Sequence, residues 1–321
     1  PEGVSLISTE NQKTIEPLKI GERRRMLFPV KANKPVEGTI LLNLCASEEG
    51  RFQVVPIEIP ISVLPSLNLP KADYVPEPKP VKSEYEIGAL YFPGWYHGHS
   101  WSRVWNRCPD RRPLLGWYNE SSPEVIDWQI KWSVENGIQY YLVDWYWNKG
   151  NQHLEHWIKG FQQAKYKSHL KWAMMWANHN GPGSHSLEDQ AKVTKYWIDN
   201  YFGMDEYYQI DGRPAVFIWS PGNIRRDMGG SRAAAELYDT SQGMARQAGF
   251  RGIYFVAMSS HESQAACRRL KTEGYEAFTS YHGFQLAEQK AGSTRFPFQH
   301  VVQTGPELWQ KADQRSNGLL Y

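Results

Sequence analysis

This chain of 321 residues lacks long apolar runs, and it has no large excess of charge of either sign. No stretch approaches the ~20 apolar residues that a membrane-spanning helix needs. The formal net charge is +2, so the composition does not favour a nucleic acid or a membrane surface as partner. We therefore expect no nucleic-acid partner and no integral membrane segment.

Cysteine is scarce as well. Cys45, Cys108 and Cys267 are widely spaced and fit neither a zinc-ligand pattern nor a disulfide framework. The histidines show no His-x-x-x-His spacing on a predicted helix and have no cysteine partner. No G-x-G-x-x-G follows the first strand of the predicted α/β region, which argues against dinucleotide binding. We predict no metal and no cofactor.

Aromatic side chains, in contrast, are abundant: the chain has 14 Trp, 18 Tyr and 12 Phe. Most of the tryptophans lie after residue 90. The chain opens at Pro1, without an initiator methionine or a signal-like segment, and we interpret it as a mature or trimmed protein. We expect a secreted, periplasmic or cell-surface location.

The first part of the chain, residues 1–69, is predicted to be all-β. Short β-branched or alternating runs separated by turn residues favour a small antiparallel, immunoglobulin-like sandwich. Alternating prolines over residues 70–84 predict an extended, semi-rigid linker, and we place the domain boundary there. The predicted strands are 4–8, 24–30, 38–45 and 52–63.

From residue 85 to residue 321, predicted strands and helices alternate. Alternating units of this kind imply a parallel sheet with right-handed crossovers, and a barrel and an open doubly wound sheet both fit. The predicted strands are 87–94, 138–147, 171–178, 215–220, 252–259 and 277–281, and the predicted helices are 123–135, 154–164, 187–201, 231–247 and 263–273.

Aromatic and polar residues gather where the predicted strands end. In a (β/α)8 barrel the site is built at the carboxyl ends of the strands. Flat rings beside polar groups suit a sugar, which offers hydroxyls at its edge and C–H groups on its face; packing in the core is the alternative for the rings. The candidate glycan-binding residues are Trp95, His97, Trp145, Trp147, Trp176, Asn178, His179 and His282.

Asp144 is the best-placed carboxylate, because it ends a predicted strand beside aromatic rings that would raise its pKa by desolvation. It is a candidate general base or partner of sugar hydroxyls, and the alternative is a structural role. Because side chains alternate along a strand, two assignments are possible. In the first, Asp144 and Leu142 face a barrel pocket and Val143 contacts the helices. In the reverse assignment, Trp145 points inward and Asp144 points toward the helices. Glu262 is the second catalytic candidate, although a first-turn helix residue that complements the dipole is the alternative.

A set of segments recurs in an order and spacing typical of one family: 91–96, 113–118, 122–126 with Gln129, 136–138, 143–147, 176–178 and 210–214. Together they resemble the glycoside hydrolase family 99-like proteins, a group of endo-α-mannosidases and WbsX-like domains of polysaccharide biosynthesis loci. The resemblance covers about residues 86–283 and implies a (β/α)8 TIM barrel. It also implies that Tyr91, Trp145 and Tyr281 line the site around the cleaved sugar.

The chain departs from this family in its carboxylates. The hydrolases carry a Glu-x-x-Glu pair in a Trp-rich stretch near the end of the barrel, and no such stretch is found here. Residues 317–321 look like the start of a seventh strand. We therefore expect a barrel that stops after its sixth βα unit, with the family's catalytic pair beyond Tyr321.

The function we predict is hydrolysis of O-glycosidic bonds in an oligosaccharide or polysaccharide, with an α-mannoside-like linkage implied by the resemblance. If that mechanism applies, the sugar's own 2-hydroxyl assists departure with net retention. Two alternatives remain open, a non-catalytic glycan-binding protein and a glycan-building enzyme of the same fold. A carboxylate pair beyond Tyr321 would favour the hydrolase over the glycan-binding protein, which does not need such a pair. A nucleotide-sugar donor site would indicate the glycan-building enzyme.

Overall fold

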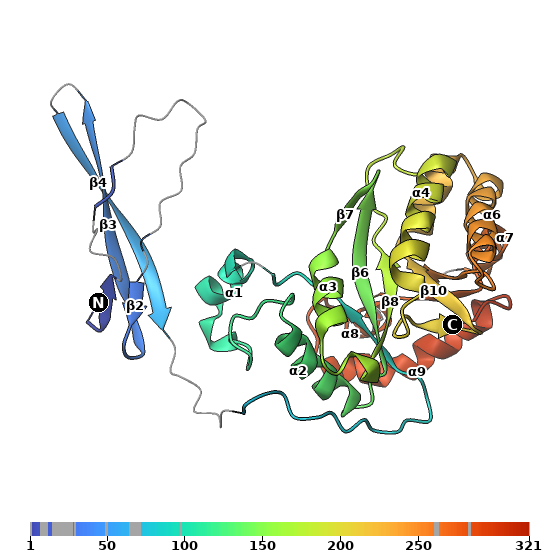
Figure 1. The fold of residues 1–321 in the computed structure, drawn as a ribbon, viewed down its shortest axis with the longest axis horizontal. Coiled ribbons are helices and arrows are strands. Elements are labelled where there is room, and N and C mark those ends of the chain that lie inside the picture. The colour runs from blue at the N-terminus through green and yellow to red at the C-terminus, as the bar shows by residue number, and fades with distance from the viewer. Residues whose placement is uncertain are drawn as a thin grey trace. The chain divides into compact units, whose positions relative to one another are not determined.

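The computed structural model describes residues 2–6, 12–14, 28, 30–48, 51–63, 72–96, 98–259, 263–281 and 284–320. The chain divides into two compact units (Figure 1). The first comprises residues 1–72 and 97–118, and the second comprises residues 73–96 and 119–321. The predicted domain boundary over residues 70–84 stays a prediction.

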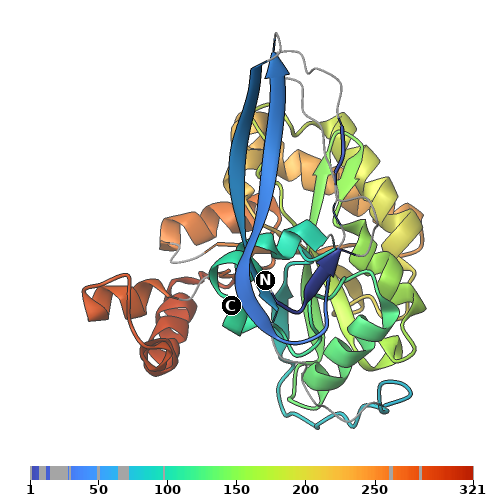
Figure 2. The same cartoon turned by 90° about the vertical axis from the view of Figure 1, so that its left-hand side faces the viewer.

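The first unit contains two antiparallel strand pairs, so its described strands are antiparallel as predicted, whereas an immunoglobulin-like sandwich of these strands stays a prediction. β1 (Val4–Leu6) pairs with β2 (Val30–Ala32), and β3 (Val36–Glu48) pairs with β4 (Arg51–Val63). Figure 2 shows the second pair as a long twisted ribbon. The predicted strand over 24–30 lies almost entirely outside the described residues.

Short helical segments complete the first unit. A 3-10 turn (Gly98–Trp101) leads into α1 (Ser102–Arg107), and a second turn spans Pro109–Arg111. Trp101 is buried, and its indole Nε1 donates to the carbonyl oxygen of Tyr118 at 2.8 Å.

The second unit is built on six parallel strands, which confirms the six strands predicted in this region. Their order in the sheet follows their order in the chain. Apolar runs such as Ala173–Trp176 are buried throughout, as expected for strands covered on both faces. The strands are β5 (Gly88–Tyr91), β6 (Tyr140–Asn148), β8 (Lys171–Trp176), β10 (Arg213–Ile218), β11 (Tyr254–Met258) and β12 (Ala277–Thr279).

Two short strands pair antiparallel to this sheet. β7 (Asn151–His153) pairs with β6, and β9 (Gln209–Ile210) pairs with β10. At the β12 edge, Leu320 forms a parallel bridge with Ala277, and the Phe278 N–H donates to the Leu320 carbonyl at 2.8 Å. Of the strand predicted to start over 317–321, the described residues show this single bridge at Leu320.

Helices follow most of the strands. Ser186 and Ser263 begin α4 and α7 with side-chain caps, accepting from the N–H groups of Asp189 and Ala266. Ser122 precedes Pro123 but makes no such cap. The helices are α2 (Pro123–Val134), α3 (Glu155–Gln163), α4 (Leu187–Trp197), α5 (Pro221–Met228), α6 (Ser231–Gln247), α7 (Gln264–Glu273), α8 (Gln285–Ala291) and α9 (Phe298–Arg315), with a 3-10 turn over Lys167–His169 and a π-helical turn over Ile198–Phe202.

The two faces of the parallel sheet differ in what covers them. One face packs on helices, where Val143 of β6 belongs to the same core as Ile130 of α2 and Trp197 of α4. The other face carries Leu142 and Met175, and no helix contributes to this second core among the described residues. A doubly wound sheet would carry helices on both faces. The second unit is therefore a curled half-barrel, with the helices outside.

Residues 73–81, in the predicted linker, lie extended along the second unit. Val75 is buried there, and its carbonyl accepts from the Tyr166 hydroxyl at 2.9 Å. The hydroxyl of Tyr74 donates to Asp127 of α2 at 2.5 Å. The prolines keep this segment extended, and the contacts of its side chains hold it against the rest of the second unit. No helix in the described part of the chain is long and apolar enough to cross a membrane.

Candidate functional site

Asp144 lies on the inner face of the half-barrel, in the middle of β6 and near the end of its parallel pairing with β8. Leu142 belongs to the inner core, whereas Val143 and Trp145 belong to the core under the helices. Because side chains alternate along a strand, Asp144 and Tyr146 point inward. Of the two assignments left open by the sequence, the structure has the one that places Asp144 in the barrel interior.

The Asp144 carboxyl is buried without being paired. The residue is 6% exposed, and its Oδ1 has no hydrogen-bond partner among the described residues. Burial raises the pKa of Asp144 to about 7. An acid in this state is half protonated near neutral pH, so it can donate a proton or accept one.

Four rings, one in β6 and three in the residues that follow β8, β10 and β12, line the same edge. Tyr146 follows Asp144 by two positions and meets His179 edge-on, with ring centroids 5.5 Å apart. His179 lies 6.2 Å from Trp219, and Trp219 meets Tyr281 edge-on at 4.4 Å. All four rings retain contact with solvent. Burial first, and then the Asp144 carboxylate, raise the pKa values of Tyr146 and Tyr281, so these hydroxyls remain donors.

Three of the predicted stacking tryptophans face the other way. Trp145, Trp147 and Trp176 are buried under the helices, where they are covered on all sides. The Trp145 indole donates to Glu155 at 2.6 Å, and the Trp147 indole donates to Asp189 at 3.1 Å. A sugar cannot stack on rings covered in this way, so this placement corresponds to the alternative of core packing.

Tyr91 also lies on the helix-facing side. Its ring stacks on Tyr141 at 4.8 Å, and its hydroxyl donates to Glu120 and to Gln129, each at 3.0 Å. The Trp95 backbone N–H donates to the other Glu120 oxygen at 2.6 Å. Burial raises the pKa of Glu120 to about 7, although these hydrogen bonds oppose the shift. Tyr91 thus holds a second buried carboxyl, which the sequence analysis missed.

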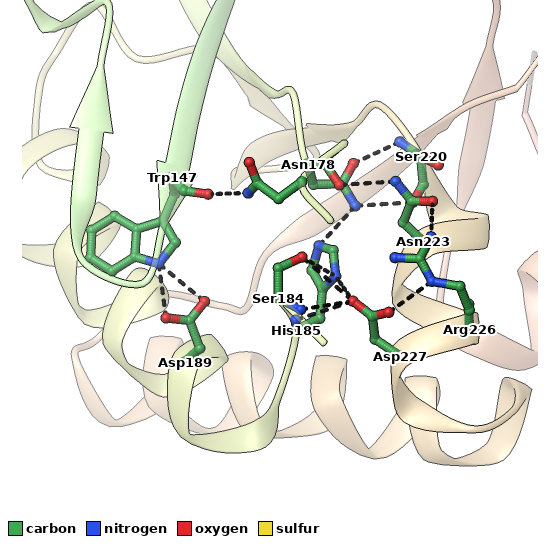
Figure 3. A network of polar contacts seen from close by, with 10 residues as sticks. Trp147, Asn178, Ser184, His185, Asp189, Ser220, Asn223, Arg226 and Asp227 are labelled. Atoms are coloured by element: carbon green, nitrogen blue, oxygen red, sulfur yellow. Dashed lines mark hydrogen bonds and ion pairs between the residues drawn. The ribbon is translucent and has the colours of Figure 1, made fainter. Parts of the chain in front are cut away.

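Asn178 fixes the end of β10 from the end of β8 (Figure 3). Its Oδ1 accepts from the Ser220 N–H at 2.7 Å, and its Nδ2 donates to the Ser220 carbonyl at 2.9 Å. Nδ2 also lies 3.3 Å from Nε2 of His185. Asn178 therefore holds the backbone next to Trp219, rather than pointing a free amide at a ligand.

His185 and Asp227 continue this network away from the inner face (Figure 3). Nδ1 of His185 lies 2.6 Å from Oδ2 of Asp227, and both side chains are 1% exposed. Burial acts against the charged form of Asp227, but hydrogen bonds from Arg226 and His185 hold its pKa well below the usual range. The pair joins the loop after β8 to α5 and thus supports the Asn178 contact with Ser220.

The remaining predicted site residues are Glu262, His97 and His282, which lie outside the described residues. The sequence analysis also missed Tyr146 and Trp219 as site residues. Both carry a signal in the sequence, since Tyr146 shares the period-two face of Asp144 and Trp219 ends a predicted strand. Within the described ranges, no three His, Cys, Asp or Glu side chains lie close enough to hold a metal ion.

A half-barrel of parallel strands, with helices outside and polar and aromatic groups at the carboxyl ends, has the architecture of the (β/α)8 enzymes. The family described as "Glycosyltransferase WbsX" matches residues 94–312, so the chain belongs to that family. A comparison with curated protein sequences gives no match.

Solved structures with a similar fold include glycoside hydrolases. One is a GH99 endo-α-mannosidase from Bacteroides thetaiotaomicron in complex with bis-tris propane, with 18% identity, a TM-score of 0.50 and coverage of 71% of this chain. The chain spans 66% of that protein's length. A second structure of a GH99 endo-α-mannosidase from this organism has 17% identity and a TM-score of 0.48, covering 72% of this chain and 68% of that one. A glycoside hydrolase-like protein has 15% identity and a TM-score of 0.48, with coverages of 77% and 73%.

Proposed function

We propose that this protein is a glycan-acting enzyme that hydrolyses an O-glycosidic bond at the inner face of the half-barrel, with Asp144 as a carboxyl that exchanges a proton with the sugar. The observation that carries the proposal is the buried Asp144 carboxyl, whose Oδ1 has no hydrogen-bond partner among the described residues. Leaving a buried polar atom unpaired costs about 1–3 kcal/mol. A ligand hydroxyl bound there would recover that cost.

The protonation state of Asp144 suits this role. With a pKa of about 7, the carboxyl is protonated in a large share of molecules at neutral pH. It can then donate to a sugar oxygen and take the proton back in a later step. Activity that depends on the acid form falls as the pH rises through about 7.

Glycoside hydrolysis generally uses two carboxyl groups, so Asp144 needs a partner. Glu262 follows β11 in the sequence and remains our candidate for this second group. The substitution Glu262→Gln should lower turnover as strongly as Asp144→Asn does. The rings of Tyr146, Trp219 and Tyr281 supply surfaces against which the C–H face of a sugar would stack.

An α-mannoside-like linkage is our proposal for the substrate. Support comes from the resemblance of the motifs and from the similar fold of a GH99 endo-α-mannosidase. The description of the chain's own family names a glycosyltransferase, which favours glycosyl transfer to an acceptor as a second candidate. The two reactions share the bound sugar and differ in whether water or a hydroxyl accepts it.

The test compares two buried carboxyls that both have a pKa of about 7. The protein is incubated with a panel of α- and β-linked oligosaccharides, with and without added acceptor sugars, and the products are identified by mass spectrometry. Asp144→Asn should lower turnover at least tenfold, about 1.4 kcal/mol of transition-state free energy, and should remove the decline of activity above pH 7. Glu120→Gln is the control, because Glu120 lies on the helix-facing side.

Unchanged turnover in Asp144→Asn would refute the role of Asp144. Product formation only in the presence of an acceptor would assign transfer instead of hydrolysis. If the wild-type protein binds an oligosaccharide but forms no product from any member of the panel, it is a non-catalytic glycan-binding protein.

A further inference from the structure

A separate pocket of about 240 Å³ lies at the carboxyl ends of β10 and β11, beside α5 and α7. Trp219 and Ser220 from the end of β10, Ser259 from the end of β11 and Arg269 of α7 belong to its wall. A water molecule takes about 30 Å³ in the liquid, so the pocket has room for a small polar group and not for an oligosaccharide.

The wall of this pocket carries one arginine that is paired with a carboxylate and one that has no such partner in the described ranges. Its ten lining residues, all in the described part of the chain, include two arginines and no acid. Arg225 is matched by the buried Glu273, since its Nη2 donates to Oε2 at 2.8 Å. Arg269 lies one helical turn before Glu273 on α7 and is exposed. The structure pairs Arg269 with no carboxylate among the residues it describes.

Two helices begin at the pocket. Pro221 and Gly222, the first residues of α5, lie in its wall, as does Ala266 in the first turn of α7. Pro221 has no backbone N–H, and the Ala266 N–H donates to the Ser263 cap, so the helix dipoles are what these two ends contribute. Helix amino termini present backbone N–H groups and a positive dipole end, which favour anions. A side-chain carbon added at Gly222 would meet no atom within 4 Å, so the first turn of α5 is open at this point.

We propose that this pocket binds an oxyanion carried by the glycan, such as a sugar carboxylate or a sulfate or phosphate ester, with Arg269 as its charged contact. The glycan part of this statement rests on the proposed function. Trp219 joins the two sites, because its ring meets Tyr281 on the inner face and the residue also belongs to the pocket wall. A sugar bound against Trp219 would therefore direct an acidic group on itself or on the adjoining unit toward Arg269.

The first experiment tests anion binding without any glycan chemistry. Sodium sulfate and sodium glucuronate are titrated into the protein by calorimetry, against sodium chloride of equal ionic strength. We expect both anions to bind and Arg269→Gln to weaken them at least tenfold. Arg268→Gln is the matched control, since Arg268 is the neighbouring exposed arginine, 3.4 Å from the Gln264 side chain and not part of the pocket wall. Failure of both anions to bind, or equal loss in the two variants, would overturn the proposal.

The second experiment tests whether the anion belongs to the glycan. Binding of a uronate-containing oligosaccharide is compared with that of its neutral counterpart of equal length, in wild type and in Arg269→Gln. We expect the acidic oligosaccharide to bind at least tenfold more tightly, and only in the wild type. Sulfate binding without this preference would mark a site for free anions and overturn the glycan-borne assignment. Absence of hydrolysis with intact anion binding would count against the proposed function alone.

Discussion

Asp144 and Trp145 are neighbours in the chain, but their side chains lie in different environments. Asp144 faces the half-barrel interior with an unpaired buried oxygen, and Trp145 packs under helices. Period-two alternation predicts that the two residues differ in this way. It does not predict which of them faces inward, because β6 is almost entirely buried on both faces. The choice depends on tertiary packing, which a single strand does not encode.

Glu120 gives a prediction on the pH dependence of stability. Burial raises its pKa to about 7, so between about pH 4.5 and pH 7 the folded state holds a proton that the unfolded state has released. Stability due to this group is fully present below about pH 4.5 and is lost as the pH rises through 7. We expect Glu120→Gln to reduce the loss of unfolding free energy between pH 5 and pH 8 by about 2–3 kcal/mol.

Urea denaturation at the two pH values measures this difference. Asp127→Asn serves as the control, because Asp127 is also fully buried but accepts hydrogen bonds from the N–H groups of Lys165 and Tyr166. An equal pH dependence in wild type and Glu120→Gln would show that Glu120 does not titrate in this range.

At the scale of elements, the six parallel strands were predictable because each is a short apolar run. The helices α5, α8 and α9 were not predicted. α5 spans only eight residues, too few for a clear helical period, and α9 contains Pro306, which breaks the usual pattern of a helix interior. The β6–β7 hairpin was also missed, although its turn carries positive φ at Lys149 and Gly150, the geometry of a tight two-residue turn.

The placement of the aromatics on two faces predicts different costs for two tryptophans. Trp145 is fully buried, packs against Trp147 and Tyr201, and donates to Glu155. Trp145→Ala should therefore lower the unfolding free energy by about 3–5 kcal/mol. Trp219 is half-buried at the rim, and Trp219→Ala should cost about 1 kcal/mol while weakening any bound oligosaccharide about tenfold.

Chemical denaturation and oligosaccharide titration on the same preparations check both halves of this prediction. If Trp145→Ala keeps the stability of the wild type and binds sugar less tightly, Trp145 belongs to the binding surface and the burial found here does not hold in solution.

At the scale of the whole molecule, contacts between distant segments were beyond the sequence analysis. His185 and Asp227 are 42 positions apart, and neither lies in a motif that pairs a histidine with an acid. The sequence likewise does not predict which face of the sheet is the inner one, because that depends on which side the helices cover. A barrel and a doubly wound sheet share the same order of strands and helices, so the local pattern fits both.

The segment over residues 73–81 shows how composition and packing act together. Alternating prolines predict an extended chain, which is observed, but not whether that chain packs against the protein. Val75 is 2% exposed, whereas Val81 is 51% exposed. Burying a valine contributes about 1.5–3 kcal/mol, and the contacts of Tyr74 and Tyr166 add hydrogen bonds. The segment should therefore be held on the second unit instead of acting as a free spacer.

This packing predicts the outcome of limited proteolysis with a protease of broad specificity. Bonds within residues 73–81 should be cut slowly in the wild type, because a protease must first pull the segment away from the second unit. Val75→Asp should speed these cuts at least tenfold, since the buried site cannot hold a charge without a partner. Val81→Asp changes an exposed valine in the same stretch and should leave the rate almost unchanged. Equal rates in all three proteins would mean that the segment is released in solution, as the proline pattern alone predicts.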